Sequence, residues 1–239
     1  MNDLLRSATI AHGGLDRWDA YRDMEAEMSI SGDLWSVKPC KEVLSDIKLE
    51  AATRLQHVIL RQFADPDHFS FFEPNLVYFE TKTREIVERR EAPRTAFADH
   101  TLETPWDRLH IAYFCSYSLW MCLTAPFLYT YPGFVVKELS PTYENGEELR
   151  RLKVNFPCDI ASHSCEQVCY FDQNGLLRRH DADIDVLGGV RVAIYAAAYR
   201  EFGGIKVATI RRAFCCDEDG NIIDVPMLFS ATTRSVEFS

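Results

Sequence analysis

The stretch Trp-Asp-Arg-Leu-His-Ile-Ala-Tyr-Phe-Cys-Ser-Tyr-Ser-Leu-Trp-Met-Cys-Leu, residues 106–123, decides the fold of this chain. It predicts a long helix that Thr104 caps and that Pro105 opens in its first turn. A helix that is apolar on every side is buried, either in a protein core or in a membrane. The rest of the sequence must therefore explain what surrounds this helix.

The charge-free run extends further than the helix, from Ile111 to Val136, and its hydropathy alone would suggest a membrane span. Pro126 and Pro132-Gly133 interrupt the run, and several serines, threonines and tyrosines dilute it. The residues that follow alternate like the strands of a soluble protein. We therefore expect the helix to be enclosed by other parts of the chain, with no stable membrane insertion.

Strand patterns occur on both sides of the helix. Asn145-Gly146 and Asn174-Gly175 are strong hairpin turns between alternating segments, and the whole region 134–238 is a series of such hairpins. Consecutive hairpins make an antiparallel meander. Residues 3–21 predict an amphipathic helix that the pair Gly13-Gly14 weakens. The fold class is therefore mainly β (α+β), a curved antiparallel sheet around a long apolar helix, with an N-terminal helix.

The composition limits the class of protein. The chain has 239 residues, 47% of them hydrophobic, and a net charge of −10. This length and apolar content predict a single domain over residues 1–239. Nucleic-acid binding needs a cluster of basic residues, and the arginines occur only in isolated pairs. We expect no nucleic-acid partner.

The cysteines and the N-terminus indicate the compartment. The charged N-terminal region has no apolar segment typical of a secretory signal and no lipidation motif, which predicts a cytoplasmic location. The 8 cysteines should then be free thiols. They form no C-x-x-C pair, so a zinc ribbon or a thioredoxin-like site is not expected.

The order of elements resembles the lipoprotein-localisation carriers, the LolA/LolB-like fold, and bacterial relatives of unknown function. Four short motifs carry the resemblance: Ala-His-Gly-Gly-Leu at 11–15, the start of the helix at 106–114, Phe-Asp-Gln-Asn-Gly-Leu-Leu-Arg-Arg-His-Asp at 171–181, and Asp-Val-Leu-Gly-Gly at 185–189. The resemblance implies a half-barrel sheet with a cavity for an apolar ligand on its concave side. It implies no reaction. Because no export signal is evident, we transfer the fold and the cavity to this chain, but not the lipoprotein cargo.

Five residues share one face of the predicted helix, at spacings of three and four. They are Trp106, His110, Tyr113, Tyr117 and Trp120. This stripe forms either a wall for a flat or apolar ligand or ordinary core. Asp107 either orients the imidazole of His110 or is a first-turn acid favoured by the helix dipole.

The strand expected at 176–186 places Arg178 and His180 on its apolar face, with Ala182, Ile184 and Val186. Buried polar groups need partners, and Gln167 on the neighbouring strand is the expected one. The pair is either a satisfied structural contact or the polar part of a ligand site.

No metal or cofactor is expected. His163, Cys165 and Cys169 occur together, but Cys165 and Cys169 would lie roughly 13 Å apart along a straight strand, too far to share one zinc ion. The sequence also contains no dinucleotide fingerprint, phosphate-binding loop or nucleophile elbow.

The leading hypothesis is a protein that binds a small apolar or aromatic molecule in the concave cavity. Trp106, Tyr113, Tyr117, Trp120 and Gln167 would contact the ligand. The alternative is an enzyme that catalyses a proton-transfer isomerisation or cyclisation there. His110 or His180 would be the acid/base and Arg178 would hold an oxyanion. A third class is a structural domain whose helix fills the sheet. The sequence identifies neither the ligand nor the oligomeric state.

Overall fold

The computed structural model describes residues 1–38, 44–63, 67–217 and 220–239. Within these residues the strands form one 13-stranded antiparallel sheet. The strands before the long helix are β1 (Asp23–Ser31), β2 (Ile47–Ala52), β3 (Val58–Arg61), β4 (His68–Glu73), β5 (Leu76–Thr81) and β6 (Ile86–Glu91). Those after it are β7 (Val135–Glu144), β8 (Glu147–Asn155), β9 (Glu166–Phe171), β10 (Leu177–Ile184), β11 (Val190–Phe202), β12 (Ile205–Cys216) and β13 (Ile222–Phe238).

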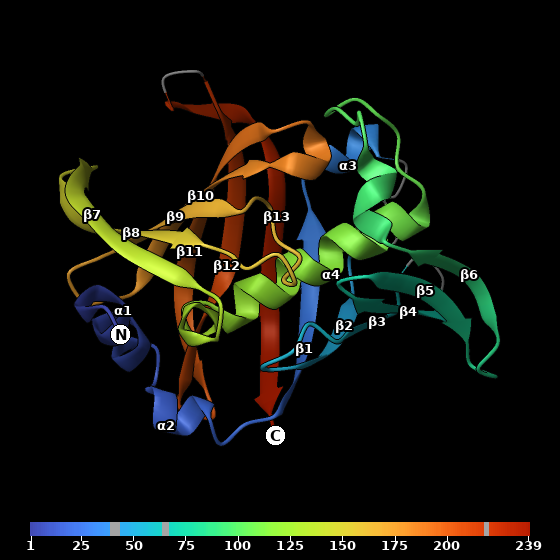
Figure 1. The fold of residues 1–239 in the computed structure, drawn as a ribbon, viewed down its shortest axis with the longest axis horizontal. Helices are drawn as coiled ribbons and strands as arrows, with labels where there is room; N and C mark the ends of the chain where they lie inside the picture. Colours follow the sequence, from blue (N-terminus) through green and yellow to red (C-terminus); the bar gives the residue numbers. More distant parts are fainter. Residues whose placement is uncertain (39–43, 64–66, 218–219) are drawn as a thin grey trace.

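The order of strands explains the shape of the molecule (Figure 1). Each strand pairs with the next one in the chain, except that β6 and β7 lie at opposite edges and that β1 pairs with β13 in the middle of the sheet. One arm of the sheet therefore runs from β1 to the edge strand β6. The other arm runs from β13 to the edge strand β7. The predicted antiparallel meander is confirmed. The pairing of β1 with β13, which joins the two arms, could not be predicted from the sequence pattern.

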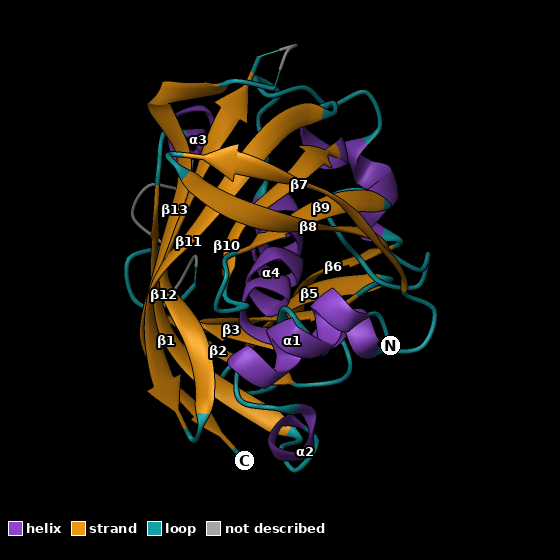
Figure 2. Ribbon diagram, turned by 90° about the vertical axis from the view of Figure 1, so that its left-hand side faces the viewer, coloured by secondary structure: helices purple, strands orange, loops and turns teal. Residues whose placement is uncertain are grey.

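The long helix α4 (Arg108–Thr124) belongs to the connection between the two edge strands and crosses the concave side of the sheet (Figure 2). Every residue of α4 is buried except Arg108 and Cys122. Its closest strands are β3, β4 and β5. The expected enclosure of the apolar helix by the sheet is confirmed. Among the described residues, no helix combines the length and the apolar character that crossing a bilayer requires.

The start of α4 differs from the prediction. Asp107, rather than Thr104, is the N-cap, because its side chain accepts the backbone N–H of His110 at 2.9 Å. The predicted first turn at Pro105 is not helical. Instead, the hydroxyl of Thr104 accepts the backbone N–H of Thr101 in the preceding turn. Asp and Thr are both good caps, so the sequence alone could not decide between them.

The short helices complete the concave side. They are α1 (Asp3–Ala11), α2 (Leu15–Trp18), α3 (Leu34–Val37) and the 3-10 turns η1 (Pro93–Phe97), η2 (Phe127–Thr130) and η3 (Asp185–Leu187). The helix predicted over residues 3–21 is present as two shorter helices, α1 and α2, with Gly13-Gly14 between them. Gly13 has a φ of 128°, and a Cβ there would lie 2.4 Å from the carbonyl oxygen of Gly204. This close approach docks the α1–α2 turn on the β11–β12 hairpin.

We predict that Leu119→Asp unfolds the protein. Leu119 lies in the middle of α4 and is fully buried, and an unpaired buried charge costs several kcal/mol, a large part of a typical domain stability. Urea unfolding followed by circular dichroism would measure the loss. Leu55→Asp is the matched control, because Leu55 is 70% exposed and should change stability by no more than about 0.5 kcal/mol. Equal stability of the two variants would contradict the enclosure of α4.

Candidate functional site

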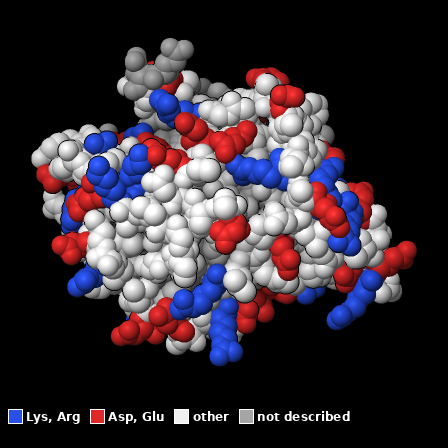
Figure 3. Space-filling model, in the orientation of Figure 1, with Lys and Arg blue, Asp and Glu red and all other residues white. Residues whose placement is uncertain are grey.

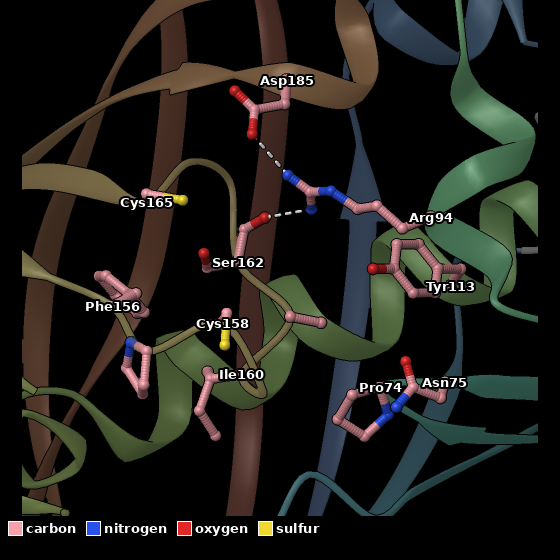
Figure 4. A pocket seen from close by; sticks show the side chains of 12 residues that line it. Pro74, Asn75, Arg94, Tyr113, Phe156, Cys158, Ile160, Ser162, Cys165 and Asp185 are labelled. Carbon is pink, nitrogen blue, oxygen red and sulfur yellow. Dashed lines mark hydrogen bonds and ion pairs between the residues drawn. The ribbon is translucent and has the colours of Figure 1, made fainter. Parts of the chain in front are cut away.

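A pocket of about 240 Å³ lies on the concave side of the sheet, between its two arms (Figure 4). The β4–β5 turn of one arm and the β8–β9 loop, residues 156–165, of the other arm form its walls. The apolar lining residues are Pro74, Phe156, Pro157, Ile160 and Ala161. The polar ones are Asn75, Arg94, Tyr113, Cys158, Ser162, Cys165 and Asp185. Apolar walls with a few convergent polar groups are typical of small-molecule sites.

Arg94 joins the two arms at this pocket. It projects from η1, which follows β6, toward the β8–β9 loop (Figure 4). Its Nη1 donates to the carbonyl of Ser162 at 2.5 Å, and its Nη2 donates to the carbonyl of His163 at 3.3 Å. The same Nη2 donates to the Asp185 carboxylate at 2.7 Å. The guanidinium group of Arg94 therefore binds two backbone carbonyls and one carboxylate side chain of the opposite arm.

Gln56 makes a second connection between the arms. Its side-chain amide donates to the carbonyl of Ala161 at 2.8 Å and accepts the backbone N–H of Ala161 at 2.7 Å. Both groups are buried. The β8–β9 loop is thus fixed across the concave side by side chains that bind its backbone.

Tyr113 is the residue of α4 that reaches the pocket, with its hydroxyl turned toward it (Figure 4). Burial raises the pKa of its phenol, and the neighbouring Arg94 guanidinium opposes part of that rise. Tyr113 therefore stays protonated near neutral pH. It offers a ligand one hydrogen-bond donor and an acceptor on an otherwise apolar helix.

A buried polar cluster continues behind Tyr113. The hydroxyl of Tyr117 lies 3.4 Å from Nδ1 of His163, and the rings of His163 and His180 are 6.2 Å apart. Nε2 of His180 forms a short hydrogen bond with Oε1 of Gln167. The expected contact between His180 and Gln167 is therefore present. Burial lowers the pKa of His163 well below its usual range, and burial followed by the charge of Arg211 lowers that of His180 to about 3.

Arg178 does not join this cluster, and the prediction that it faces the core is wrong. The register of β10 against β9 shifts between Leu177 and Arg179. This bulge turns Leu177 inward and leaves the Arg178 side chain 40% exposed. Its Nε donates to the carboxylate of Asp172 at 2.7 Å. Strand alternation fails here because a bulge inserts one extra residue into the pattern.

His110 also lies outside the pocket. Its Nδ1 faces the backbone N–H of Asp107 at 3.3 Å, and its Nε2 lies 3.2 Å from the carbonyl of Ala96. Asp107 thus both caps the helix and contacts the imidazole, and it also pairs with Arg90 at 2.6 Å. The described contacts give His110 a structural position at the start of α4, apart from His180.

The remaining aromatic residues of the predicted stripe are core. Trp106 is 3% exposed, and Nζ of Lys38 lies over its ring, 4.6 Å from the ring centroid. Trp120 is fully buried, and its indole N–H donates to the carbonyl of Ala52 at 2.8 Å. Tyr117 is fully buried as well. The stripe therefore does not form an open wall, because both arms of the sheet cover α4.

Three parts of the site were not predicted from the sequence: Arg94, Gln56 and the β8–β9 loop. The one available signal was the spacing between two predicted strands, which leaves residues 157–163 too long for a tight hairpin turn. Cys158 and Cys165 of this loop are exposed free thiols. The five further described cysteines form no disulfide either, and Cys40 lies outside the described residues. The described residues contain no group of three or more potential metal ligands.

No protein-family model matches the chain, and no curated protein matches it. Solved structures do. A putative outer membrane lipoprotein-sorting protein domain from Vibrio parahaemolyticus superposes with a TM-score of 0.57 at 12% identity, over 99% of this chain and 91% of that one. A DUF1329 family protein from Desulfovibrio piger gives 0.53 at 11% identity, covering 99% and 92%. A LolA superfamily protein from Nitrosomonas europaea gives 0.50 at 7% identity, covering 94% and 91%.

The chain has a LolA-like fold. The half-barrel sheet that the sequence resemblance implied is therefore confirmed. At these identities the LolA-like likeness concerns the fold alone, so the residues of the pocket must be interpreted from this chain's own chemistry.

We predict that the buried imidazole of His180 makes stability depend on pH. Its folded pKa of about 3 lies below the usual 6.5, so the unfolded state binds more protons between these values. Stability is complete above pH 6.5 and falls as pH falls toward 3. Between pH 7.5 and 5, His180 alone should account for a loss of about 2 kcal/mol.

Urea unfolding of wild type and His180→Gln at both pH values tests this. The variant should lose about 2 kcal/mol less on acidification than wild type does. An identical loss in both proteins would show that His180 has the same pKa in the folded and unfolded states, which would contradict the prediction.

Proposed function

We propose that this protein binds a small apolar or aromatic molecule on the concave side of its sheet and that the pocket at Tyr113 receives it. The observation that supports this most is the composition of the pocket. Five apolar side chains from the β4–β5 turn and the β8–β9 loop line it beside seven polar ones, among them Tyr113 and Asn75. Such groups fix the orientation of a ligand while the walls supply affinity.

The face around the pocket fits this proposal. Figure 3 shows that uncharged side chains fill most of the middle of this face, whereas charged ones lie mainly toward its edges. The pocket volume of about 240 Å³ is smaller than the 300–1,000 Å³ typical of drug-sized ligands. The ligand is therefore small, or the β8–β9 loop shifts to admit it.

The Vibrio parahaemolyticus relative is named for lipoprotein sorting. A lipoprotein is a hydrophobic cargo, and a shared LolA-like fold supports a ligand of the same broad chemical class here. The shared fold does not select a lipoprotein, because the residues of the two proteins differ too widely.

The enzyme alternative finds no support among the described residues. His110 faces backbone groups at the start of α4, and Arg178 pairs with Asp172 away from the pocket. His180, with its pKa lowered to about 3 by burial and Arg211, is a poor general base near neutral pH. We therefore retain binding as the proposed activity.

We also propose that the protein works in the cytoplasm as a single domain spanning residues 1–239. Cys158 and Cys165 are exposed free thiols on one loop, a state that a reducing compartment preserves. The two arms of the sheet contribute to one hydrophobic core cluster, which supports a single folding unit.

Filling the pocket should abolish binding. Cys158 is exposed and lines the pocket, so Cys158→Trp should occupy part of its volume without unfolding the protein. Titration with the fluorescent apolar probe N-phenyl-1-naphthylamine, whose emission rises on burial, would measure this. We expect saturable binding to wild type and at least a tenfold weaker affinity for the variant.

Asp159→Trp is the matched control, since Asp159 is the next residue, is exposed and does not line the pocket. It should bind the probe like wild type. Equal weakening by both substitutions, or by neither, would argue against this pocket as the site.

A further inference from the structure

Arg211 places a buried positive charge on the concave side of the sheet. It lies on β12 with 5% of its surface exposed. Its neighbours on the adjoining strands are Ala196 and Ala231, and Ala213 follows on the same face of β12. The long side chain therefore rises from a floor of small residues toward α4.

Among the described residues, the guanidinium group donates to one acceptor, the carbonyl of Cys122 in the last turn of α4, at 2.7 Å. The C-terminal end of a helix dipole is worth about half a negative charge. Roughly half of the positive charge of Arg211 thus has no compensation from the helix, and the described residues offer no further hydrogen-bond acceptor to its five N–H donors.

No carboxylate of the described residues forms an ion pair with Arg211. The buried carboxylate of this region, Asp172, is already engaged. It accepts from Nε of Arg178 at 2.7 Å and from the backbone N–H groups of Asn174 and Leu176 at 2.9 and 3.0 Å. A buried charge of this kind needs a partner, and the described chain does not supply a full one.

Two residues near Arg211 are partly exposed. Cys122 is the one residue between Leu109 and Thr124 that is not buried, and Tyr199 on β11 is also partly accessible. His12 and His180 are close enough to Arg211 for its charge, after burial, to help lower their pKa values to about 4 and about 3. Both imidazoles are therefore neutral near pH 7 and neither balances nor adds to the charge.

A line of polar groups connects Arg211 with the pocket. Tyr113 lines the pocket, and its ring centroid lies 5.3 Å from that of Tyr117. Tyr117 contacts His163, which packs 6.2 Å from His180. His180 lies within the electrostatic reach of Arg211. The buried side chains between the pocket and Arg211 thus include hydrogen-bonding groups that carry no charge.

We propose that Arg211 binds the carboxylate of an acidic apolar ligand, such as a long-chain carboxylic acid, whose apolar part extends toward the pocket at Tyr113. This inference rests on the proposed function and names the chemical class of the ligand. A carboxylate matches the planar fork of the guanidinium group with two parallel hydrogen bonds and supplies the missing negative charge.

The test compares an acid with its neutral ester. The probes are cis-parinaric acid and its methyl ester, both fluorescent, titrated into the full chain at low ionic strength and neutral pH. Wild type should bind the acid about 10- to 100-fold more tightly than the ester, the range expected for hydrogen bonds to a charged group. Arg211→Gln should bind both probes with the affinity that wild type shows for the ester.

Two further variants keep the result interpretable. Arg212→Gln is the matched control, because Arg212 is the next residue of β12 and is exposed; it should keep the preference for the acid. Arg211→Lys keeps the charge and should retain part of that preference. Thermal melting would reveal whether loss of the contact with Cys122 prevents Arg211→Gln from folding. In that case Arg211→Lys replaces it in the comparison of acid and ester.

The outcomes separate the two proposals. If acid and ester bind wild type equally, or if Arg211→Gln keeps the preference, the role of Arg211 is overturned while apolar binding stands. If neither probe binds, both proposals fail. Competition of bound cis-parinaric acid by decanoate, decyl phosphate and decanol identifies the head group: we expect decanoate to compete best, and stronger competition by decyl phosphate would overturn the carboxylate assignment.

Discussion

The pairing of β1 with β13 is the constraint on which the rest of the structure depends. It joins the first and last strands in the middle of the sheet, so the two free edges belong to β6 and β7, which are consecutive in the chain. The connection between them must then travel from one edge of the sheet to the other. The shortest covered route crosses the concave side. The apolar character of α4 follows from this route, because a helix placed there meets protein on every side.

A buried helix must satisfy its terminal backbone groups without bulk water. At the N-terminal end, the Asp107 side chain accepts the backbone N–H of His110. In turn, Nδ1 of the His110 imidazole accepts the backbone N–H of Asp107. At the other end Arg211 donates to the carbonyl of Cys122. The polar residues at the two ends of α4 thus have structural positions before any ligand is considered. His110 has no donor or acceptor left for chemistry, whereas Arg211 meets one acceptor among the described residues.

The sequence predicted the elements better than the site because the elements depend on local pattern. The apolar run of α4, the break at Gly13-Gly14 and the Asn-Gly turns each fix their own neighbourhood, and all three are present. The inward direction of Arg178 was wrong because one bulge reverses strand alternation, and no residue of that segment indicates the bulge. The pocket was missed for a different reason. Arg94, Gln56 and the β8–β9 loop are up to 105 residues apart in sequence, and they meet only because β1 and β13 bring the arms around the helix.

The way in which the two arms hold α4 indicates where a ligand would enter. The helix packs closest to β3, β4 and β5 in one arm. Toward the other arm, the pocket lies between the helix and the β8–β9 loop, and polar residues such as His163 and His180 stand behind it. The loop itself is fixed by the hydrogen bonds of Gln56 and Arg94 to its backbone. Phe156 and Ala161 of the loop also belong to the hydrophobic core, and Arg94 pairs with Asp185 of the same arm. The contacts that hold the loop also shape the pocket, so a ligand that enters there would meet the hydroxyl of Tyr113 on the helix.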